Sequence, residues 1–407
     1  MSYIGSRSYV KPVEDVNKSI LKSLNNPVDS LPLKEKLSGK KDVMILIEDN
    51  TRNTPVKDIL EVLLPYLLDN GIDNNDITIM TAPGTHRIMT KQEIIDKVGD
   101  EIAKEYRIVQ HDYLDKSLLI NLGMVKVNEI EIPIEVNRYA VEADFLIGIG
   151  SILPHSDAGF SGGAKIVEPG ICGYSTTAAT HISAALLEEI PLGSVNNPCR
   201  QGIEEVTSQI GLDFIINVVK NCQGEIAGVF AGDFIAAHRK GVRLAEKSYG
   251  IKIKEKTDIV IATSHPFDLD WWQADKGLIS AYFAVRAGGT IIFLTPCKEG
   301  LENNHPCLQK WLKKSYKDAC QEAVKLDLYK EEYDLIAADL AISNAKIRER
   351  NDIFIVTDGL SEEQISVLGY KPYDNLQKAI DIALEANPEA TIGILPEGGD
   401  ILPVIEE

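Results

Sequence analysis

Short runs of apolar, mostly β-branched residues alternate with longer amphipathic stretches along this chain. Strand-length runs followed by stretches with a helical period are typical of βαβ units. The pattern predicts strands at 42–48, 76–81, 107–111, 143–149, 257–263, 290–295, 352–357 and 390–395. It predicts helices at 55–70, 90–105, 175–189, 198–210, 231–248, 272–287, 306–324, 361–369 and 374–386. Two apolar runs around an Asn-Cys-Gln-Gly turn predict a hairpin between 213 and 230.

The alternation of elements predicts an α/β fold with two domains, each with a largely parallel sheet flanked by helices. A Lys-rich segment at 251–258 separates a long predicted helix from a new strand, which is where a domain boundary is expected. We therefore expect an N-terminal domain at 1–252 and a C-terminal domain at 253–407.

Composition narrows the class of partner. The 407 residues carry 42 Lys and Arg against 61 Asp and Glu, a net charge of −19, which argues against nucleic acid or an anionic membrane as a partner. The six cysteines are scattered and form no metal or disulfide pattern, as is usual in a reducing compartment. The chain begins without an apolar leader and has no apolar run near ~20 residues, so a cytoplasmic location is expected.

Polar residues gather directly after three of the predicted strands. Asp49 and Arg52 follow the first strand, His86 follows the second, and His155 follows the strand at 143–149. Thr54 is the expected N-cap of the next helix, which leaves Asp49 and Arg52 for other contacts. Each loop alone could be an ordinary solvated loop. Because ligands bind beyond the carboxyl ends of strands in α/β sheets, three such loops together favour a site.

A glycine-rich loop at 159–165 ends on Lys165. Backbone amides in such a loop can hold an anion, so a phosphate or nucleotide is possible here. The loop is not a Walker A motif, because Ala164 precedes the lysine and Ile166 follows it. The segment 148–151 also lacks the third glycine of a dinucleotide fingerprint. Lys165 could instead be a point of covalent attachment.

His181 stands on a predicted helix among small and apolar residues, 16 positions after Lys165. One interpretation is a satisfied histidine of the core. The other is a metal ligand, since neutral imidazole suits nickel, copper or zinc. No second ligand stands three or four residues away, so a bound metal would need most of its ligands from a cofactor.

Gln273 and Lys276 stand one helical turn apart and share a face, where they could bind a carboxylate. The alternative is an exposed helix start capped by Asp268 or Asp270. The two tryptophans that precede Gln273 are expected to pack in the core rather than against a substrate.

Taken in order, these motifs resemble those of the lactate racemase family, the nickel-pincer racemases and epimerases of 2-hydroxy acids. The resemblance rests on Asp-Asn-Thr-Arg at 49–52, Gly-Thr-His-Arg at 84–87, the segment 154–170, His181, and Gln-Ala-Asp-Lys at 273–276. It spans most of the chain and both expected domains.

The resemblance implies an active site in the cleft between the domains and a nickel-pincer nucleotide as cofactor, a pyridinium mononucleotide with two sulfur-bearing arms. By position in the motifs, Lys165 would carry this nucleotide and His181 would ligate its nickel. His86 and His155 would be the acid–base pair. The implied partners are a small 2-hydroxy acid and cofactor-assembly proteins.

The remaining motif residues would bind cofactor and substrate. Asp49 and Arg52 would hold the cofactor, and Arg52 would also orient the substrate together with Gln273 and Lys276. A hydride moved off and back onto the α-carbon, with one histidine on each side for the hydroxyl proton, would invert that carbon.

Three alternatives remain open at this point. The substrate could be another 2-hydroxy acid, such as malate, an aryl-lactate or an aldonic acid. The protein could be a zinc hydrolase that uses His86, His155 and His181 as ligands. It could also be a nucleotide-binding or cofactor-carrier protein without activity.

Overall fold

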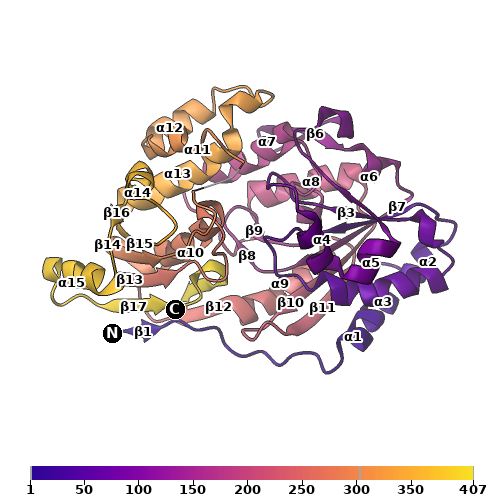
Figure 1. Ribbon diagram of the computed structural model, residues 1–407, viewed down its shortest axis with the longest axis horizontal. Coiled ribbons are helices and arrows are strands. Elements are labelled where there is room, and N and C mark those ends of the chain that lie inside the picture. The colour runs from indigo at the N-terminus through magenta and orange to yellow at the C-terminus, as the bar shows by residue number, and fades with distance from the viewer. Residues whose placement is uncertain (1, 302–303, 407) are drawn as a thin grey trace.

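The computed structural model describes residues 2–301 and 304–406, and these form two α/β domains side by side (Figure 1). Apart from the first residues of the chain, the indigo to pink elements belong to the first domain, and the salmon, orange and yellow elements belong to the second. Both marked chain ends lie at the second domain. The expected fold class, two α/β domains with largely parallel sheets, is confirmed.

A six-stranded sheet, in the order β11-β10-β7-β2-β3-β4, forms the centre of the first domain. Its strands are β2 (Val43–Ile47), β3 (Ile77–Thr81), β4 (Arg107–Gln110), β7 (Phe145–Ser151), β10 (Phe214–Lys220) and β11 (Ile226–Gly232). Neighbouring strands are parallel except β10 and β11, which form the predicted hairpin. Both faces are buried: Ile45 packs into the core on one side of the sheet and Leu46 into the core on the other.

Helices cover both faces of this sheet. They are α1 (Val16–Asn25), α2 (Leu33–Lys36), α3 (Val56–Asp69), α4 (Lys91–Val98), α5 (Asp100–Glu105), α6 (Arg138–Glu142), α7 (Tyr174–Ala185), α8 (Pro198–Ile210) and α9 (Ala236–Tyr249). Two small hairpins accompany them, β5 (Leu119–Val127) with β6 (Ile130–Asn137), and β8 (Pro154–His155) with β9 (Gly159–Phe160). Short 3₁₀ turns are η1 (Asn74–Asp76), η2 (Lys116–Leu118) and η3 (Gly163–Ile166).

The second domain has a parallel sheet in the order β1-β17-β13-β14-β15-β16. Its strands are β1 (Tyr3–Ile4), β13 (Thr257–Thr263), β14 (Val285–Leu294), β15 (Asp352–Val356), β16 (Lys371–Pro372) and β17 (Ile392–Leu395). Its helices are α10 (Trp271–Ala284), α11 (Leu308–Leu312), α12 (Tyr316–Ala323), α13 (Leu335–Arg350), α14 (Glu362–Leu368) and α15 (Leu376–Ala386). The 3₁₀ turns η4 (Glu331–Tyr333) and η5 (Gly398–Asp400) complete it, and β12 (Gly250–Ile253) pairs with β18 (Leu402–Ile405).

Several expected elements differ in detail. The helix expected at 90–105 is divided by Gly99, whose φ of 93° no helical residue adopts. The helix expected at 306–324 is likewise two helices, because Ser315 leaves the helical conformation and caps α12. Helix α13 was not expected at all. Thr54 is not the N-cap of α3, since its hydroxyl bonds to Glu48 and Ser151 instead.

The first residues of the chain cross to the second domain. Strand β1 adds to the edge of the second sheet through β17. Arg7 then donates to the carbonyl of Ser248 and, at 2.9 Å, to Oδ2 of Asp400. The division into 1–252 and 253–407 stays a prediction, and the first few residues depart from it.

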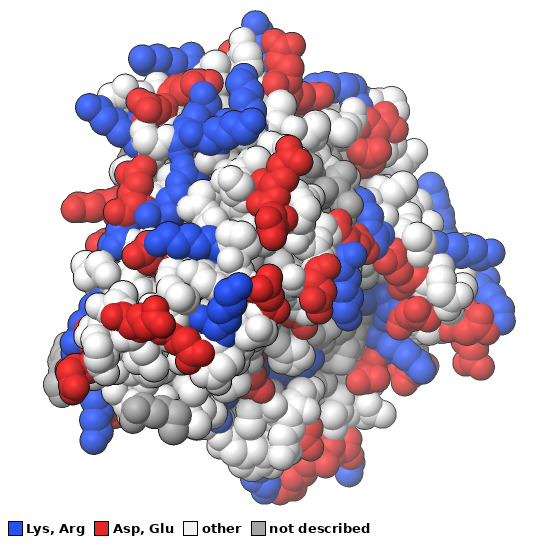
Figure 2. Space-filling view, turned by 60° about the vertical axis from the view of Figure 1, so that its left-hand side comes forward, with Lys and Arg blue, Asp and Glu red and all other residues white. Residues whose placement is uncertain are grey.

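The surface carries charged side chains of both signs. Lys and Arg side chains lie among Asp and Glu over the face in Figure 2. Among residues 2–301 and 304–406, no helix combines the length and apolar character needed to cross a membrane.

Candidate active site

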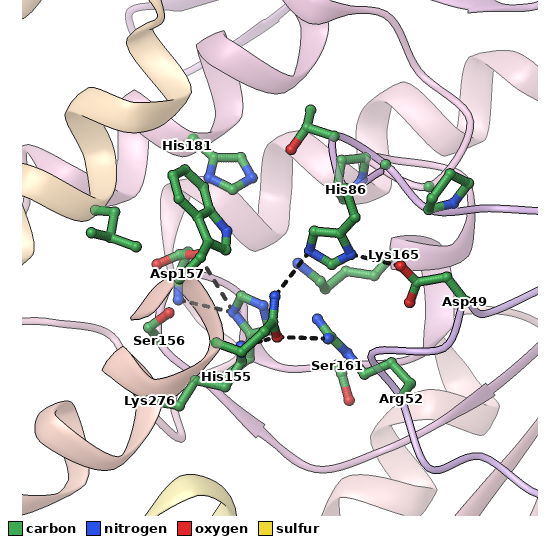
Figure 3. A pocket seen from close by; sticks show the side chains of 18 of the residues that line it. Asp49, Arg52, His86, His155, Ser156, Asp157, Ser161, Lys165, His181 and Lys276 are labelled. Carbon is green, nitrogen blue, oxygen red and sulfur yellow. Dashed lines mark hydrogen bonds and ion pairs between the residues drawn. The ribbon is translucent and has the colours of Figure 1, made fainter. Parts of the chain in front are cut away.

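The eight residues singled out from the sequence line one cleft between the two domains. They are Asp49, Arg52, His86, His155, Lys165, His181, Gln273 and Lys276. The cleft has an empty volume of about 990 Å³, its open mouth included. Loops after β2, β3 and β7 supply the side of the first domain, while α10 and α13 supply the other side (Figure 3).

His86 is held from both domains. Its Nδ1 donates to Oδ2 of Asp49 at 2.8 Å, and the amide of Gln273 lies 3.3 Å from its Nε2. The orientation of that amide follows from its other partners: the guanidinium of Arg52 can only donate, so Oε1 of Gln273 accepts from it and also from Lys276. The amide nitrogen therefore faces His86 and donates to it. His86 thus presents the lone pair of Nε2, as a general base requires.

Asp49 is a carboxylate at neutral pH. Burial would raise its pKa, but the charges and hydrogen bonds of His86, Arg52 and Thr51 hold the pKa at about 2. Thr51 donates to Oδ1 at 2.6 Å, so each oxygen of Asp49 has a partner. Asp49 therefore orients His86, in addition to any contact with a cofactor.

His155 has the opposite arrangement of its ring protons. The backbone amide of Asp157 donates to its Nδ1 at 3.2 Å, so the neutral ring carries its proton on Nε2. Burial, followed by the charges of Lys165 and Arg52, lowers the pKa of His155 well below 6.5. One histidine of the cleft therefore offers a lone pair at Nε2, and the other offers an N–H.

The glycine loop before Lys165 is held in place by buried side chains. Asn217 accepts from the backbone amide of Gly163 at 2.7 Å. Arg200, which is fully buried, donates to the carbonyl of Ala158 at 3.1 Å, to that of Gly162 at 3.3 Å and to that of Phe160. A Cβ on Gly163 would lie 2.9 Å from the His238 ring, at a φ of 61°. Only glycine fits this turn.

The amine of Lys165 is available for reaction. It has no hydrogen-bond or ion-pair partner among residues 2–301 and 304–406, and it reaches into the cleft (Figure 3). Burial lowers its pKa, which favours the neutral, nucleophilic form.

His181 lies on the same cleft and is not an enclosed core residue. Its Nδ1 is 2.8 Å from Oδ2 of Asp339 on α13. Burial opposes its protonation, but the hydrogen bond and charge of Asp339 outweigh this and raise the pKa of His181. Ligand atoms of Asp157, His181 and Asp339 lie within 4.8 Å of one another.

The start of α10 is buried, so its polar residues belong to the cleft. Asp270 caps the helix by accepting from the amide of Gln273 at 2.9 Å, which confirms one of the two expected caps. Lys276 lies 2.6 Å from Oε1 of Gln273, and burial together with the charge of Arg52 lowers its pKa to about 7. Trp272 was expected in the core, but it lines the cleft and stacks on a histidine ring.

Four further residues of the site were not singled out from the sequence. Asp157 and Asp339 flank His181, Arg200 holds the glycine loop, and Glu168 is buried with one carboxyl oxygen, Oε2, unpartnered. Asp157 and Glu168 fall inside the glycine-loop motif, so the motif was the available signal for them. Asp339 gave none, because helix α13 was not expected.

Fold and site together define a two-domain α/β enzyme whose cleft takes reactive side chains from both domains. The models of the lactate racemase N-terminal and C-terminal domains match residues 1–190 and 252–402. The chain therefore belongs to the lactate racemase family, and it is an isomerase of the racemase type.

Individual relatives support the assignment along the whole chain. The lactate racemase of Thermoanaerobacterium thermosaccharolyticum is 30% identical over 409 residues, covering 98% of this chain and 93% of that protein. The lactate racemase of Lactiplantibacillus plantarum is 35% identical over 289 residues, covering 70% of this chain and 66% of that protein. The lactate racemase apoprotein structure from Thermoanaerobacterium thermosaccharolyticum aligns with a TM-score of 0.85 at 27% identity, covering 98% and 94% of the two chains.

Proposed function

We propose that this protein racemises lactate, or a closely related short 2-hydroxy acid, with a nickel-pincer nucleotide attached to Lys165. The observation that carries the proposal is the convergence of two cations on one oxygen beside a general base. Lys276 and Arg52 approach Oε1 of Gln273 to 2.6 and 3.3 Å, and the amide of the same side chain contacts His86. A substrate carboxylate that binds these cations lies next to His86.

The residues of the cleft fit the proposed cofactor. Lys165 provides a free amine for attachment, and His181 provides an open Nε2 for nickel. Two buried carboxyl oxygens, Oε2 of Glu168 and Oδ1 of Asp339, have no hydrogen-bond partner. Burial raises the pKa of both groups, so a bound group with positive charge would stabilise their ionised forms. When bound, the cofactor would supply the acceptor to which the α-hydrogen leaves as hydride and from which it returns.

The side chains of this protein would do the rest. Arg52 and Lys276 bind the carboxylate from opposite domains and fix the α-carbon between the two histidines. Nε2 of His86 takes the hydroxyl proton of one enantiomer. When the hydride returns, a protonated His155 would give its proton to the keto oxygen, which becomes the hydroxyl of the other enantiomer, and the two roles exchange in the reverse direction.

A zinc hydrolase is less well supported. Among the described ranges, the only group of potential ligands close enough for one metal ion is Asp157, His181 and Asp339. His86 and His155 do not join it, so the three histidines do not form one zinc site. A pure carrier protein would have no use for a paired base and acid in the same cleft.

The test uses protein from a host that builds the pincer cofactor. Peptide mapping should find a nickel-associated adduct on the peptide with Lys165, and chiral chromatography should show L-lactate converted to D-lactate and the reverse. Changing His86 or His155 to alanine should abolish both directions. Malate, an aryl-lactate and an aldonic acid, assayed in parallel, decide whether another 2-hydroxy acid is preferred. A loaded, folded protein inactive on all four acids would refute the proposal.

The remaining expectations follow from the same proposal. A tethered nickel nucleotide must be made elsewhere, so cofactor-assembly proteins are the expected partners. A cytoplasmic location, which the scattered cysteines favour, stays a prediction.

A further inference from the structure

A carboxylate from the second domain holds the imidazole of His181. Asp339 lies in the second turn of α13, is 4% exposed, and places Oδ2 2.8 Å from Nδ1 of His181 on α7. Helices α13 and α7 pack against each other across the domain boundary, where the orange and magenta ribbons meet in Figure 1. The orientation of a first-domain histidine is thus set by a second-domain residue.

This contact decides which ring nitrogen is available. A neutral imidazole has one donor and one acceptor nitrogen, so a ring that donates from Nδ1 to a carboxylate keeps its lone pair on Nε2. Within the described part of the chain, Nε2 of His181 has no hydrogen-bond partner, and the ring borders the cleft together with Lys165. The lone pair is therefore free where a cofactor on Lys165 would lie.

The surroundings of Asp339 favour such a role over simple packing. Its second oxygen, Oδ1, is buried without a hydrogen-bond partner, and the carboxylate of Asp157 lies within 4.8 Å. Two carboxylates this close destabilise each other unless positive charge lies near them. A cation bound by His181 would supply this positive charge, because part of it is transmitted through the imidazole to the carboxylate that accepts from Nδ1.

We propose that Asp339 is a positioning residue that fixes the Nε2-available tautomer of His181 for nickel, and that this makes the metal geometry depend on the contact between the domains. The role in nickel binding rests on the proposed function. The role in setting the tautomer does not.

The first test therefore uses the cofactor-free protein. Nitrogen-15 NMR of the labelled histidines reads the tautomer of His181, assigned with His181→Gln. At a pH high enough for the His181 ring to be neutral, we expect the proton on Nδ1 in the parent, a mixture in Asp339→Leu, and the proton shifted toward Nε2 in Asp339→Asn, whose amide can donate to Nδ1. Ser343→Ala, one turn further along the same side of α13 and next to the same cleft, is the control and should match the parent.

The second test uses protein loaded with the cofactor. Loss of a carboxylate behind a metal-bound histidine typically costs about 10–100-fold in metal affinity or activity. We expect Asp339→Leu to lose nickel faster on gel filtration, to show one nitrogen ligand fewer by X-ray absorption, and to lower kcat with KM for lactate little changed. Asp339→Glu should recover part of the loss.

Each outcome decides something different. A His181 tautomer unchanged in both Asp339→Leu and Asp339→Asn would overturn the positioning role, as would parental nickel retention in a loaded Asp339→Leu. Free Ni²⁺ or Zn²⁺ bound by the cofactor-free protein, and lost in both Asp157→Asn and Asp339→Leu, would replace it with an ion site. A parent that takes up no nickel would overturn the proposed function, and the NMR result would still decide the tautomer.

Discussion

Replacing Asp49 by asparagine tests the assignment of His86 as a base. Asp49 is 2% exposed, and its contacts with His86, Arg52 and Thr51 outweigh burial and hold its pKa at about 2, against an ordinary 3.8. The difference corresponds to about 2 kcal/mol of interaction that favours the charged over the neutral carboxyl. Asparagine closely resembles the neutral form. Asp49→Asn should therefore lower the free energy of unfolding at pH 7 by about 2 kcal/mol.

The pH dependence of the free energy of unfolding tests separately whether Asp49 stabilises the protein in its charged form. Because the pKa of Asp49 is depressed in the folded protein, its stabilisation is present above about pH 4 and is lost as the pH falls toward 2. The free energy of unfolding of the parent should fall by this amount between about pH 4 and pH 2, whereas Asp49→Asn should not show this part of the decrease. Urea unfolding at several pH values between 3 and 7 measures both.

Activity should fall for the same physical reason. When His86 takes a proton, the carboxylate of Asp49 stabilises the charged ring through the bond at 2.8 Å. Removing about 2 kcal/mol from that step lowers kcat roughly 30-fold, with KM for lactate nearly unchanged. Asp58→Asn, which changes an exposed carboxylate in the first turn of α3, is the matched control and should keep the parental rate. Parental kcat in a folded, loaded Asp49→Asn would refute the assignment.

Three further changes test other parts of the site. Burial and the charge of Arg52 lower the pKa of Lys276 to about 7, so Lys276 loses its charge above that pH. KM for lactate should therefore rise between about pH 7 and 9 in initial-rate assays. Lys276→Arg, which keeps its charge, should flatten this rise. Arg200→Met leaves three buried carbonyls without donors and should cost about 3 kcal/mol or more by urea unfolding. Gly163→Ala, blocked by His238, should abolish the adduct on Lys165 in intact mass spectra, whereas Gly211→Ala, with open space around its Cβ, should keep it.

The sequence predicted the parts of the fold and site that short-range patterns encode. The apolar runs of β2, β3 and β7 identify strands, and residues that follow strand ends in a parallel sheet must share an edge. Asp49, His86 and His155 were found this way, and the structure places all three in one cleft. The residue pair on α10 left two interpretations open, and burial in the folded chain excludes the exposed helix start, while carboxylate binding by the pair stays a prediction.

What the sequence did not predict depends on long-range contacts. Twelve of the 16 residues of α13 are buried, so the helix has no polar face and no helical period to detect. Asp339 was therefore missed along with its helix. Thr54 looked like a helix cap because its neighbours in sequence allow one. Its hydroxyl bonds instead to Glu48 and Ser151, the latter 97 residues away in the chain.

The contacts between domains have a consequence for turnover. Two side chains of the second domain each contact a ring nitrogen of a first-domain histidine. Gln273 lies 3.3 Å from Nε2 of His86, and Asp339 lies 2.8 Å from Nδ1 of His181. If the domains separate, the base loses the contact at its reactive nitrogen and the expected nickel ligand loses its acceptor. Arg52 and Lys276 would also part, since they come from opposite sides of the cleft. In the proposed mechanism, substrate binding, base orientation and metal geometry would therefore all be complete only when the domains are together, and closure would keep water away from the proposed hydride transfer.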